Sequence, residues 1–282
     1  MSARHRLAAP VIAVSALVLS SCSAVDEFSD ASSATTDVTT TIELDLPGVG
    51  SRPLRIALYG DSIGEEIYPY LEIFANAARP VTIDRNVYGG TNACDWFDEA
   101  ERDAQNFNPD IVITMFVGND FTACTRPTGQ YQTPGKIAWR TVADINALAS
   151  LFPESVPVYR VGYARSRTQQ AALDESGAAN KFDGIRYLLA MPSPDRMRYI
   201  DGSEVLLENG RYTDTLPCTI LDGTNCGDDG RIQVRDDEGV HLCPAVSSSQ
   251  AGVINQCPVY SSGAARLAAH VLTFVLAPKA SS

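Results

Sequence analysis

Histidine and lysine are scarce in this chain, and their scarcity excludes several kinds of site. The 282 residues hold three histidines and three lysines, against nineteen arginines. His5 falls in an N-terminal segment that we expect to be removed, so His241 and His270 are the imidazoles that remain. A zinc site needs three or four nitrogen or sulfur ligands, and the cysteines form no CxxC pair. We therefore predict no metal site and no cofactor.

Basic charge is also in short supply. The formal net charge is −12 and the pI is about 4.6. An acidic surface argues against nucleic acid as a partner and against unaided binding to anionic lipid. The sequence also contains no internal repeat and no second long apolar run.

The N-terminal residues 1–21 are typical of an export signal. Arg4 and Arg6 precede an apolar run over residues 8–19. That run is too short to cross a bilayer, but it has the length of the apolar region of a signal peptide. We therefore expect residues 1–21 to be removed.

A cysteine directly follows this segment. The run Leu19-Ser20-Ser21-Cys22 resembles a bacterial lipobox, in which the cysteine becomes the lipidated first residue of the mature protein. This resemblance implies a lipid anchor at Cys22 and a location outside the cytoplasmic membrane. The alternative is an ordinary signal peptide cut a few residues later, with Cys22 incidental. Residues 22–52 are rich in Ser, Thr, Asp and Ala and predict a flexible tether, and residues 53–282 predict one domain.

The other six cysteines suit disulfides in an exported protein. Six cysteines allow fifteen pairings. We prefer the pairing that closes two short local loops and joins two loops that the expected sheet brings together. This pairing is Cys94–Cys124, Cys218–Cys226 and Cys243–Cys257.

Short apolar runs alternate with longer segments of helical periodicity, which predicts a parallel sheet covered by helices on both sides. The expected fold class is α/β, a three-layer α/β/α sandwich with a mostly parallel central sheet. An Asn209-Gly210 turn also predicts a small hairpin. The expected strands are residues 54–59, 81–87, 111–117, 156–161 and 197–201, and the expected helices are residues 63–77, 136–152 and 262–276, with a further helix within 169–189.

Three polar loops follow directly after strands of this pattern. They are Gly60-Asp61-Ser62, Gly89-Gly90-Thr91 and Gly118-Asn119-Asp120. Because ligands collect at the carboxyl ends of parallel strands, the sheet would bring all three loops to one edge. We therefore expect the functional site at this edge.

Each loop offers a group that acyl transfer needs. Ser62 enters a helix, where free backbone N–H groups can face an oxyanion, and its hydroxyl is a candidate nucleophile. The Asn119 amide and the N–H of Gly89 or Gly90 could donate to the same oxyanion. The alternatives are a helix cap at Asp61 or Ser62, a turn asparagine and a flexible glycine turn.

The run Glu238-Gly239-Val240-His241 supplies the remaining groups. His270 lies among apolar residues of the last expected helix, which leaves His241 as the candidate general base. Glu238 could orient the imidazole, with Asp236 and Asp237 as nearby alternatives. The acidic residues of this region could instead form a surface loop or bind calcium, although their spacing does not match an EF-hand. These residues are Asp222, Asp228, Asp229, Asp236, Asp237 and Glu238.

The three polar loops and the run from Glu238 to His241 occur in the same order as the four sequence blocks of the SGNH (GDSL-type) hydrolase superfamily. The chain resembles that superfamily over residues 54–276. One departure concerns the third catalytic position, because the family usually has aspartate three residues before the histidine and this chain has Glu238. The resemblance implies a flavodoxin-like fold, with Ser62 as nucleophile, His241 as base, and Asn119 with Gly89 or Gly90 as the oxyanion hole.

Two flanking segments, Cys94-Asp95-Trp96 and His241-Leu242-Cys243-Pro244, resemble the SGNH domains attached to bacterial membrane acyltransferases that modify envelope glycans. The resemblance implies a serine esterase or O-acyltransferase that acts on O-acyl groups of cell-envelope glycans or glycolipids through an acyl-enzyme on Ser62. The alternatives are a non-catalytic module that binds a carbohydrate or a protein, and a lipase or phospholipase, for which the sequence shows no extended apolar lid. We expect a monomer, held to the membrane by its lipid anchor.

Overall fold

The computed structural model describes residues 52–126, 132–177, 180–244 and 257–277. The expected signal peptide, Cys22 and the expected tether up to Ser51 lie outside the described residues, so the lipid anchor stays a prediction. Within the described part, no helix combines the length and the hydropathy needed to span a bilayer.

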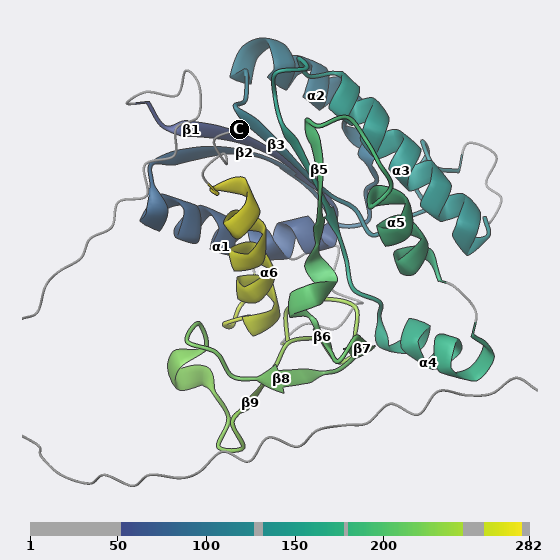
Figure 1. Ribbon diagram of the computed structural model, residues 1–282, viewed down its shortest axis with the longest axis vertical. Coiled ribbons are helices and arrows are strands. Elements are labelled where there is room, and N and C mark those ends of the chain that lie inside the picture. Colours follow the sequence, from purple (N-terminus) through teal and green to yellow (C-terminus); the bar gives the residue numbers. More distant parts are fainter. Residues whose placement is uncertain (1–51, 127–131, 178–179, 245–256, 278–282) are drawn as a thin grey trace, which may run out of the picture. The chain divides into compact units, whose positions relative to one another are not determined.

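A five-stranded parallel sheet forms the centre of the described domain (Figure 1). Its strands are β1 (Leu54–Gly60), β2 (Val81–Val87), β3 (Ile111–Met115), β4 (Val158–Gly162) and β5 (Met197–Asp201). They lie in the order β2-β1-β3-β4-β5, and all neighbours are parallel. β1, β3 and β4 are buried almost throughout, which is why their sequences are largely apolar runs instead of alternating patterns. The strands lie where the sequence predicts them, and the α/β fold class is confirmed.

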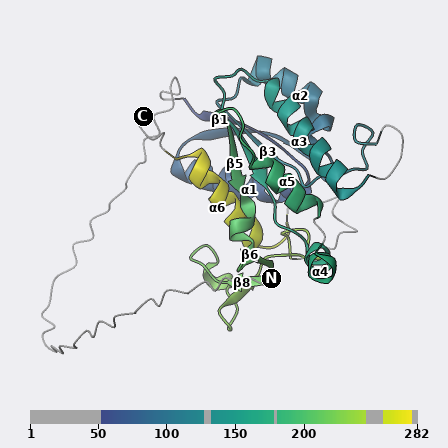
Figure 2. The ribbon, with the colours of Figure 1, turned by 45° about the vertical axis from the view of Figure 1, so that its right-hand side comes forward.

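Helices cover both faces of the sheet, which gives the predicted three layers (Figures 1 and 2). α1 (Ser62–Ala78) and α6 (Ser262–Val275) pack together on one face, over a core that includes Leu71 and Leu267. The other face is covered by α2 (Phe97–Arg102), α3 (Pro134–Ser150) and α5 (Lys181–Leu189).

The segment predicted to contain one further helix forms two. α4 (Arg167–Ser176) begins with a capping box between Ser166 and Gln169. It ends at Gly177, whose φ of +65° is the left-handed conformation that closes a helix. α5 then begins after a new cap at Asn180. A helix-ending signal at Gly177 and a helix-starting signal at Asn180 therefore divide one stretch of helical periodicity.

Two short hairpins lie between β5 and α6. β6 (Leu207–Glu208) and β7 (Arg211–Tyr212) pair antiparallel around the Asn209-Gly210 turn, so the predicted hairpin is confirmed. β8 (Thr215–Pro217) pairs with β9 (Arg231–Gln233). Short 3₁₀ turns at Ala93–Trp96, Gly202–Val205 and Gly223–Asn225 and a π turn at Asp103–Phe107 are also present.

All three predicted disulfides are present. Cys94–Cys124 joins the loop after β2 to the loop after β3, across 30 residues of sequence. Cys218–Cys226 and Cys243–Cys257 close shorter segments, with separations of 8 and 14 residues. The first disulfide therefore ties together two of the three strand-end loops, and the last ties the segment after His241 to the segment that precedes α6.

Candidate active site

The candidate nucleophile lies in the tight turn between β1 and α1. Gly60 ends the strand, and a Cβ there would lie 3.0 Å from the carbonyl oxygen of Met115, so a side chain would push the turn away from the sheet. Asp61 caps the helix by accepting the N–H of Ile63 at 3.1 Å. Ser62 is therefore the first residue of α1, at the carboxyl end of the sheet.

The carboxylate of Asp61 joins this turn to the loop after β3. It is fully buried, and it accepts the N–H of Val117 at 2.7 Å and the amide of Asn119 at 3.3 Å. Burial raises the pKa of Asp61 to about 6, against the opposing effect of its backbone hydrogen bonds. The helix cap that was one alternative for Asp61 is therefore present. Its bonds to Val117 and Asn119 add a link between the two loops that was not predicted.

The structure brings Ser62 and His241 together across 179 residues of sequence. The Nε2 of His241 lies 3.0 Å from the Oγ of Ser62, within the reach that a base needs to its nucleophile. His241 follows β9 in a loop over residues 235–242, which we call the histidine loop. This loop lies against the start of α1, because the N–H of Leu242 donates to Glu66 at 2.7 Å.

Asp236 lies behind His241 and completes a row of three groups. Its Oδ2 is 3.4 Å from the Nδ1 of His241. Its Oδ1 accepts the backbone N–H groups of Val240 at 2.9 Å and of His241 at 3.1 Å. The Asp236 side chain is fully buried. Asp236 therefore holds the position from which a carboxylate fixes the tautomer and the orientation of the ring.

This geometry corrects the expectation for Glu238. A tight turn closes between Asp236 and Gly239, in which the N–H of Gly239 donates to the carbonyl of Asp236 at 3.0 Å and Gly239 has a φ of +74°. The turn leaves Asp237 and Glu238 exposed. Counting three residues back from the histidine fails here because the turn takes up two additional residues.

The surroundings of His241 favour its protonated form. Burial works against the imidazolium, but the hydrogen bond to Asp236 and the nearby carboxylates of Glu66 and Asp61 outweigh burial and raise the pKa of the ring. An imidazolium that forms when the ring takes a proton from Ser62 is therefore stabilised.

Asn119 lies beside the nucleophile turn, near the beginning of the loop after β3. Its amide nitrogen donates to Asp61 and, at 3.1 Å, to the carbonyl of Thr91. The preceding Gly118 has a φ of +80°, and a Cβ there would lie 2.7 Å from Ile185, so the loop requires glycine. To hold an oxyanion, the Asn119 amide has to exchange one of its two bonds when a substrate arrives.

The two candidate glycines of the loop after β2 differ in their surroundings. The N–H of Gly89 faces the buried carboxylate of Glu65, where it favours the ionised form of that carboxylate. Gly90 has a φ of +83°, and a Cβ there would lie 2.9 Å from the ring of Phe121. Thr91 ties this loop to the nucleophile turn by donating to the carbonyl of Gly60 at 3.2 Å. Gly90 is therefore the better candidate for the oxyanion hole.

A tyrosine and an arginine support the histidine loop, and the sequence analysis missed both. The hydroxyl of Tyr163 donates to the carbonyl of Val240 at 2.6 Å. The fully buried Arg235 lies over the Tyr163 ring at 4.9 Å and donates to the same carbonyl at 3.3 Å. Tyr163 directly follows β4, and this position at the carboxyl end of a strand is a signal from which it could have been predicted. Arg235 carries no such signal, because nothing local distinguishes it from a surface arginine.

The acidic residues of the C-terminal region do not converge on one point in the described residues. Asp222 pairs with Arg266 at 2.7 Å, whereas Asp236 pairs with His241. The remaining four are exposed: Asp228, Asp229, Asp237 and Glu238. The calcium alternative therefore has no assembled set of ligands in this part of the chain.

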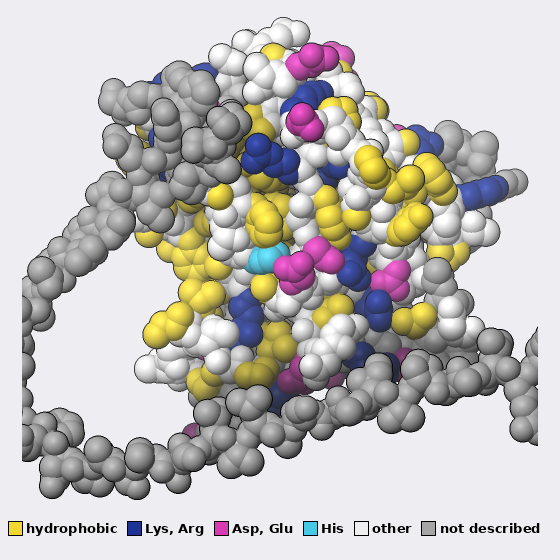
Figure 3. Space-filling view, viewed as in Figure 1, with side chains coloured by type: hydrophobic (Ala, Val, Ile, Leu, Met, Phe, Trp, Pro, Cys, Tyr) yellow, Lys and Arg dark blue, Asp and Glu magenta, His cyan; other side chains and the backbone are white. Residues whose placement is uncertain are grey.

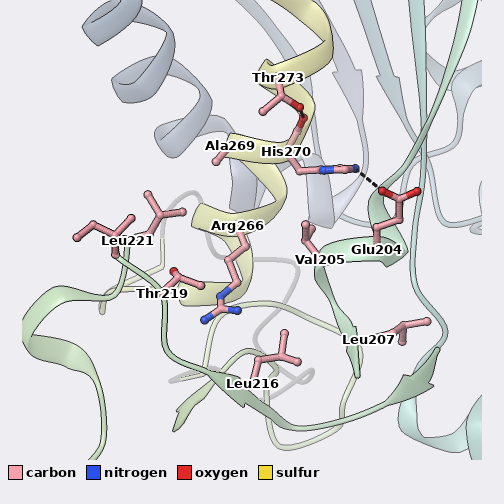
Figure 4. Close-up of a pocket in the computed structure, with 11 residues that line it drawn as sticks. Glu204, Val205, Leu207, Leu216, Thr219, Leu221, Arg266, Ala269, His270 and Thr273 are labelled. Carbon is pink, nitrogen blue, oxygen red and sulfur yellow. Dashed lines mark hydrogen bonds and ion pairs between the residues drawn. The ribbon is translucent and has the colours of Figure 1, made fainter. Parts of the chain in front are cut away.

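The cavity drawn in Figure 4 is lined by other residues. Its volume is about 510 Å³, and its mostly apolar lining comes from α6 and from segments between residues 204 and 221. The Nε2 of His270 points toward the carboxylate of Glu204 at 3.8 Å beside this cavity. Neither Ser62 nor His241 lines it.

Solved structures that are similar to this chain include lipases and an esterase. A lipase/acylhydrolase from Enterococcus faecalis is 14% identical, with 81% of this chain and 100% of that chain covered and a TM-score of 0.43. An acetyl xylan esterase is 15% identical, with 79% and 100% covered and a TM-score of 0.44. A GDSL-like lipase from Bacteroides thetaiotaomicron is 15% identical, with 66% and 81% covered and a TM-score of 0.39. Similarity at this level carries no argument about activity.

Comparison with curated proteins gave no match. One family model, described as a protein of unknown function (DUF459), matches residues 55–252. The match covers more than half of the chain, and it contains Ser62, Asn119, Asp236 and His241. The chain therefore belongs to the DUF459 family, which is an SGNH-like family.

Proposed function

We propose that this protein is a serine ester hydrolase with Ser62 as its nucleophile. The observation that carries the proposal is the row of contacts from Asp236 through His241 to Ser62, with distances of 3.4 Å and 3.0 Å. A nucleophile, a base and an orienting carboxylate in this arrangement are the groups that acyl transfer uses.

In the first step, the Oγ of Ser62 attacks the ester carbonyl while its proton moves to the Nε2 of His241. The N–H groups of Ser62 and Gly90 and the amide of Asn119 stabilise the negative charge on the carbonyl oxygen. As the tetrahedral intermediate collapses, His241 gives the proton to the leaving alcohol. An acyl group then remains on Ser62.

In the second step, His241 takes a proton from water, and the water oxygen attacks the acyl-serine. The bond to Oγ breaks, the proton returns to Ser62, and the carboxylic acid leaves. If a sugar hydroxyl replaces water, the same intermediate gives O-acyl transfer instead of hydrolysis. The proposal needs no metal and no organic cofactor.

For the substrate, we propose O-acyl groups of cell-envelope glycans or glycolipids outside the cytoplasmic membrane. The export-type N-terminal segment with Cys22 supports this location, and three disulfides are typical of an oxidising compartment. On the face drawn in Figure 3, basic side chains are interspersed with acidic ones and form no continuous patch, which supports a glycan more than a nucleic acid. We also propose that the protein is a monomer on a lipid anchor.

Two alternatives have less support. A non-catalytic binding module has no need of an imidazole 3.0 Å from a serine hydroxyl. A lipase or phospholipase would be supported by a large apolar cavity at Ser62, but the apolar cavity of about 510 Å³ is lined by other residues.

The first test is turnover of p-nitrophenyl esters of increasing acyl length. We expect Ser62→Ala and His241→Ala to lower kcat/KM by about 10⁴-fold or more, because either change removes a group that acts in both steps. Ser150→Ala is the matched control, since Ser150 is exposed on α3, and it should keep full activity. A fluorophosphonate probe should label the parent and not Ser62→Ala. Full turnover by Ser62→Ala would exclude the proposal.

A further inference from the structure

Glu66 is a carboxylate at the site that the reaction described above does not use. It lies on α1 four residues after Ser62, so both side chains project from the same side of the helix. Its Oε2 accepts the N–H of Leu242 at 2.7 Å, and Leu242 directly follows His241. Glu66 therefore joins the helix of the nucleophile to the loop of the base.

Neutral groups hold the histidine loop at two other points. The hydroxyl of Ser261, at the start of α6, donates to the carbonyl of Leu242 at 2.5 Å. The hydroxyl of Tyr163, after β4, donates to the carbonyl of Val240. Glu66 differs from both because it brings a negative charge to the loop as well as a hydrogen bond.

The charge of Glu66 acts on the imidazole. Its carboxylate raises the pKa of His241, although burial opposes this effect. In turn, burial raises the pKa of Glu66 to about 7, while the charge of His241 lowers it. From the side of α6, the described contact with the histidine loop is made by the neutral hydroxyl of its N-cap residue Ser261. The titratable and charged groups around this pair are Asp236 and Arg235 from the histidine loop, Asp61 and Glu65 from the start of α1, and the phenol of Tyr163 after β4.

We propose that Glu66 is a positioning residue that fixes the histidine loop and stabilises the imidazolium of His241 while Ser62 is acylated. The inference rests on the proposed function, because the imidazolium forms when the proton of Ser62 moves to Nε2. No bond to Glu66 forms or breaks in this step. Asp236 acts on the imidazole by direct contact. Glu66 acts on it by the electrostatic effect of its charge and by holding the neighbouring Leu242 in place.

The test is an NMR titration of His241 in the full chain. Glu66→Gln keeps the size of the side chain and an acceptor for Leu242 but removes the charge. The pKa of His241 should therefore fall by about 0.5 to 1 unit. Glu72→Gln is the matched control, because Glu72 is exposed on the same helix. The spectrum of His241→Ala assigns the signal, and His270 serves as a reference in the same spectrum.

Activity gives a second readout. The base must be neutral to act, so the acid limb of the kcat/KM profile of Glu66→Gln should move to lower pH by the same amount. The value of kcat should fall about threefold to tenfold, with KM changed by less than about twofold. Glu66→Asp keeps the charge but is too short to reach Leu242, so it should lose kcat while keeping the parental titration of His241.

Two outcomes would overturn the proposal. One is a folded Glu66→Gln protein in which the titration of His241 is unchanged. The other is an equal shift in Glu66→Asp, since that would assign the effect to packing instead of charge. The titration requires no turnover, so an inactive parent would count against the proposed function alone.

Discussion

Asp236 and Glu238 are two residues apart and have opposite surroundings. Asp236 is buried, accepts two backbone N–H groups of the histidine loop and faces the His241 ring, whereas Glu238 is exposed on a turn. Burial alone would raise the pKa of Asp236, but its bonds from His241 and Val240 lower it, so Asp236 is ionised wherever the base is neutral. The carboxylate that matters is thus the one with buried donors, not the one at the usual spacing.

Substitution of these two residues should separate them. We expect Asp236→Asn to lower kcat/KM by about 10²- to 10⁴-fold, because an amide can hold the wrong tautomer of the ring. Glu238→Gln should stay within about twofold of the parent. The comparison needs only ester turnover of the two purified variants. A larger loss of kcat/KM in Glu238→Gln than in Asp236→Asn would assign the third catalytic position to Glu238 instead.

The loops at the strand ends show how far elements can be predicted from sequence. Buried parallel strands are apolar runs, so β1 and β3 and the polar loops after them are visible in the sequence. The turn that exposes Glu238 is not visible, because a single glycine at residue 239 marks it and many loops contain one. The side chain of Arg235 is likewise placed by tertiary packing against Tyr163, which no local pattern records.

The disulfide between two of these loops should matter for catalysis as well as for stability. The double variant Cys94→Ala/Cys124→Ala unlinks the loop of Gly90 from that of Asn119. We expect it to lower the free energy of unfolding by about 2–4 kcal/mol and kcat/KM by about tenfold. Removing Cys218–Cys226 by the same substitutions is the control, since that pair is in another loop and should cost stability with little effect on turnover. Equal losses of activity in both variants would contradict this prediction.

Over the whole molecule, the perturbed carboxyl groups set the pH dependence of stability. Burial raises the pKa of Asp61 to about 6 and that of Glu66 to about 7. Both groups bind protons more tightly when folded, so stability falls as the pH rises from about 4 to 7. Asp222 contributes to the pH dependence of stability with the opposite sign. Burial is outweighed there by hydrogen bonds, first from Ser262, that lower its pKa to about 2, so its stabilisation is lost as the pH falls from about 4 to 2.

The melting temperature should therefore be highest near pH 4 and lower by about 5 °C at pH 8. Thermal unfolding followed by circular dichroism across this range would measure the curve. Glu66→Gln should flatten the decline above pH 5, because it removes one of the buried groups that cause it. A melting temperature that rises from pH 5 to pH 8 would show that these carboxyl groups do not dominate.

The proposed nucleophile belongs to the first helix of the described domain and its proposed base to a loop just before the last. During synthesis, Ser62 thus exists long before the residue that activates it. A chain interrupted anywhere before residue 241 would carry a serine hydroxyl with no proton acceptor, and an incompletely folded one would lack the docking of the histidine loop on α1 and α6. If Ser62 and His241 act as proposed, the topology leaves the serine without its base until residue 241 has been made and the histidine loop has folded against α1.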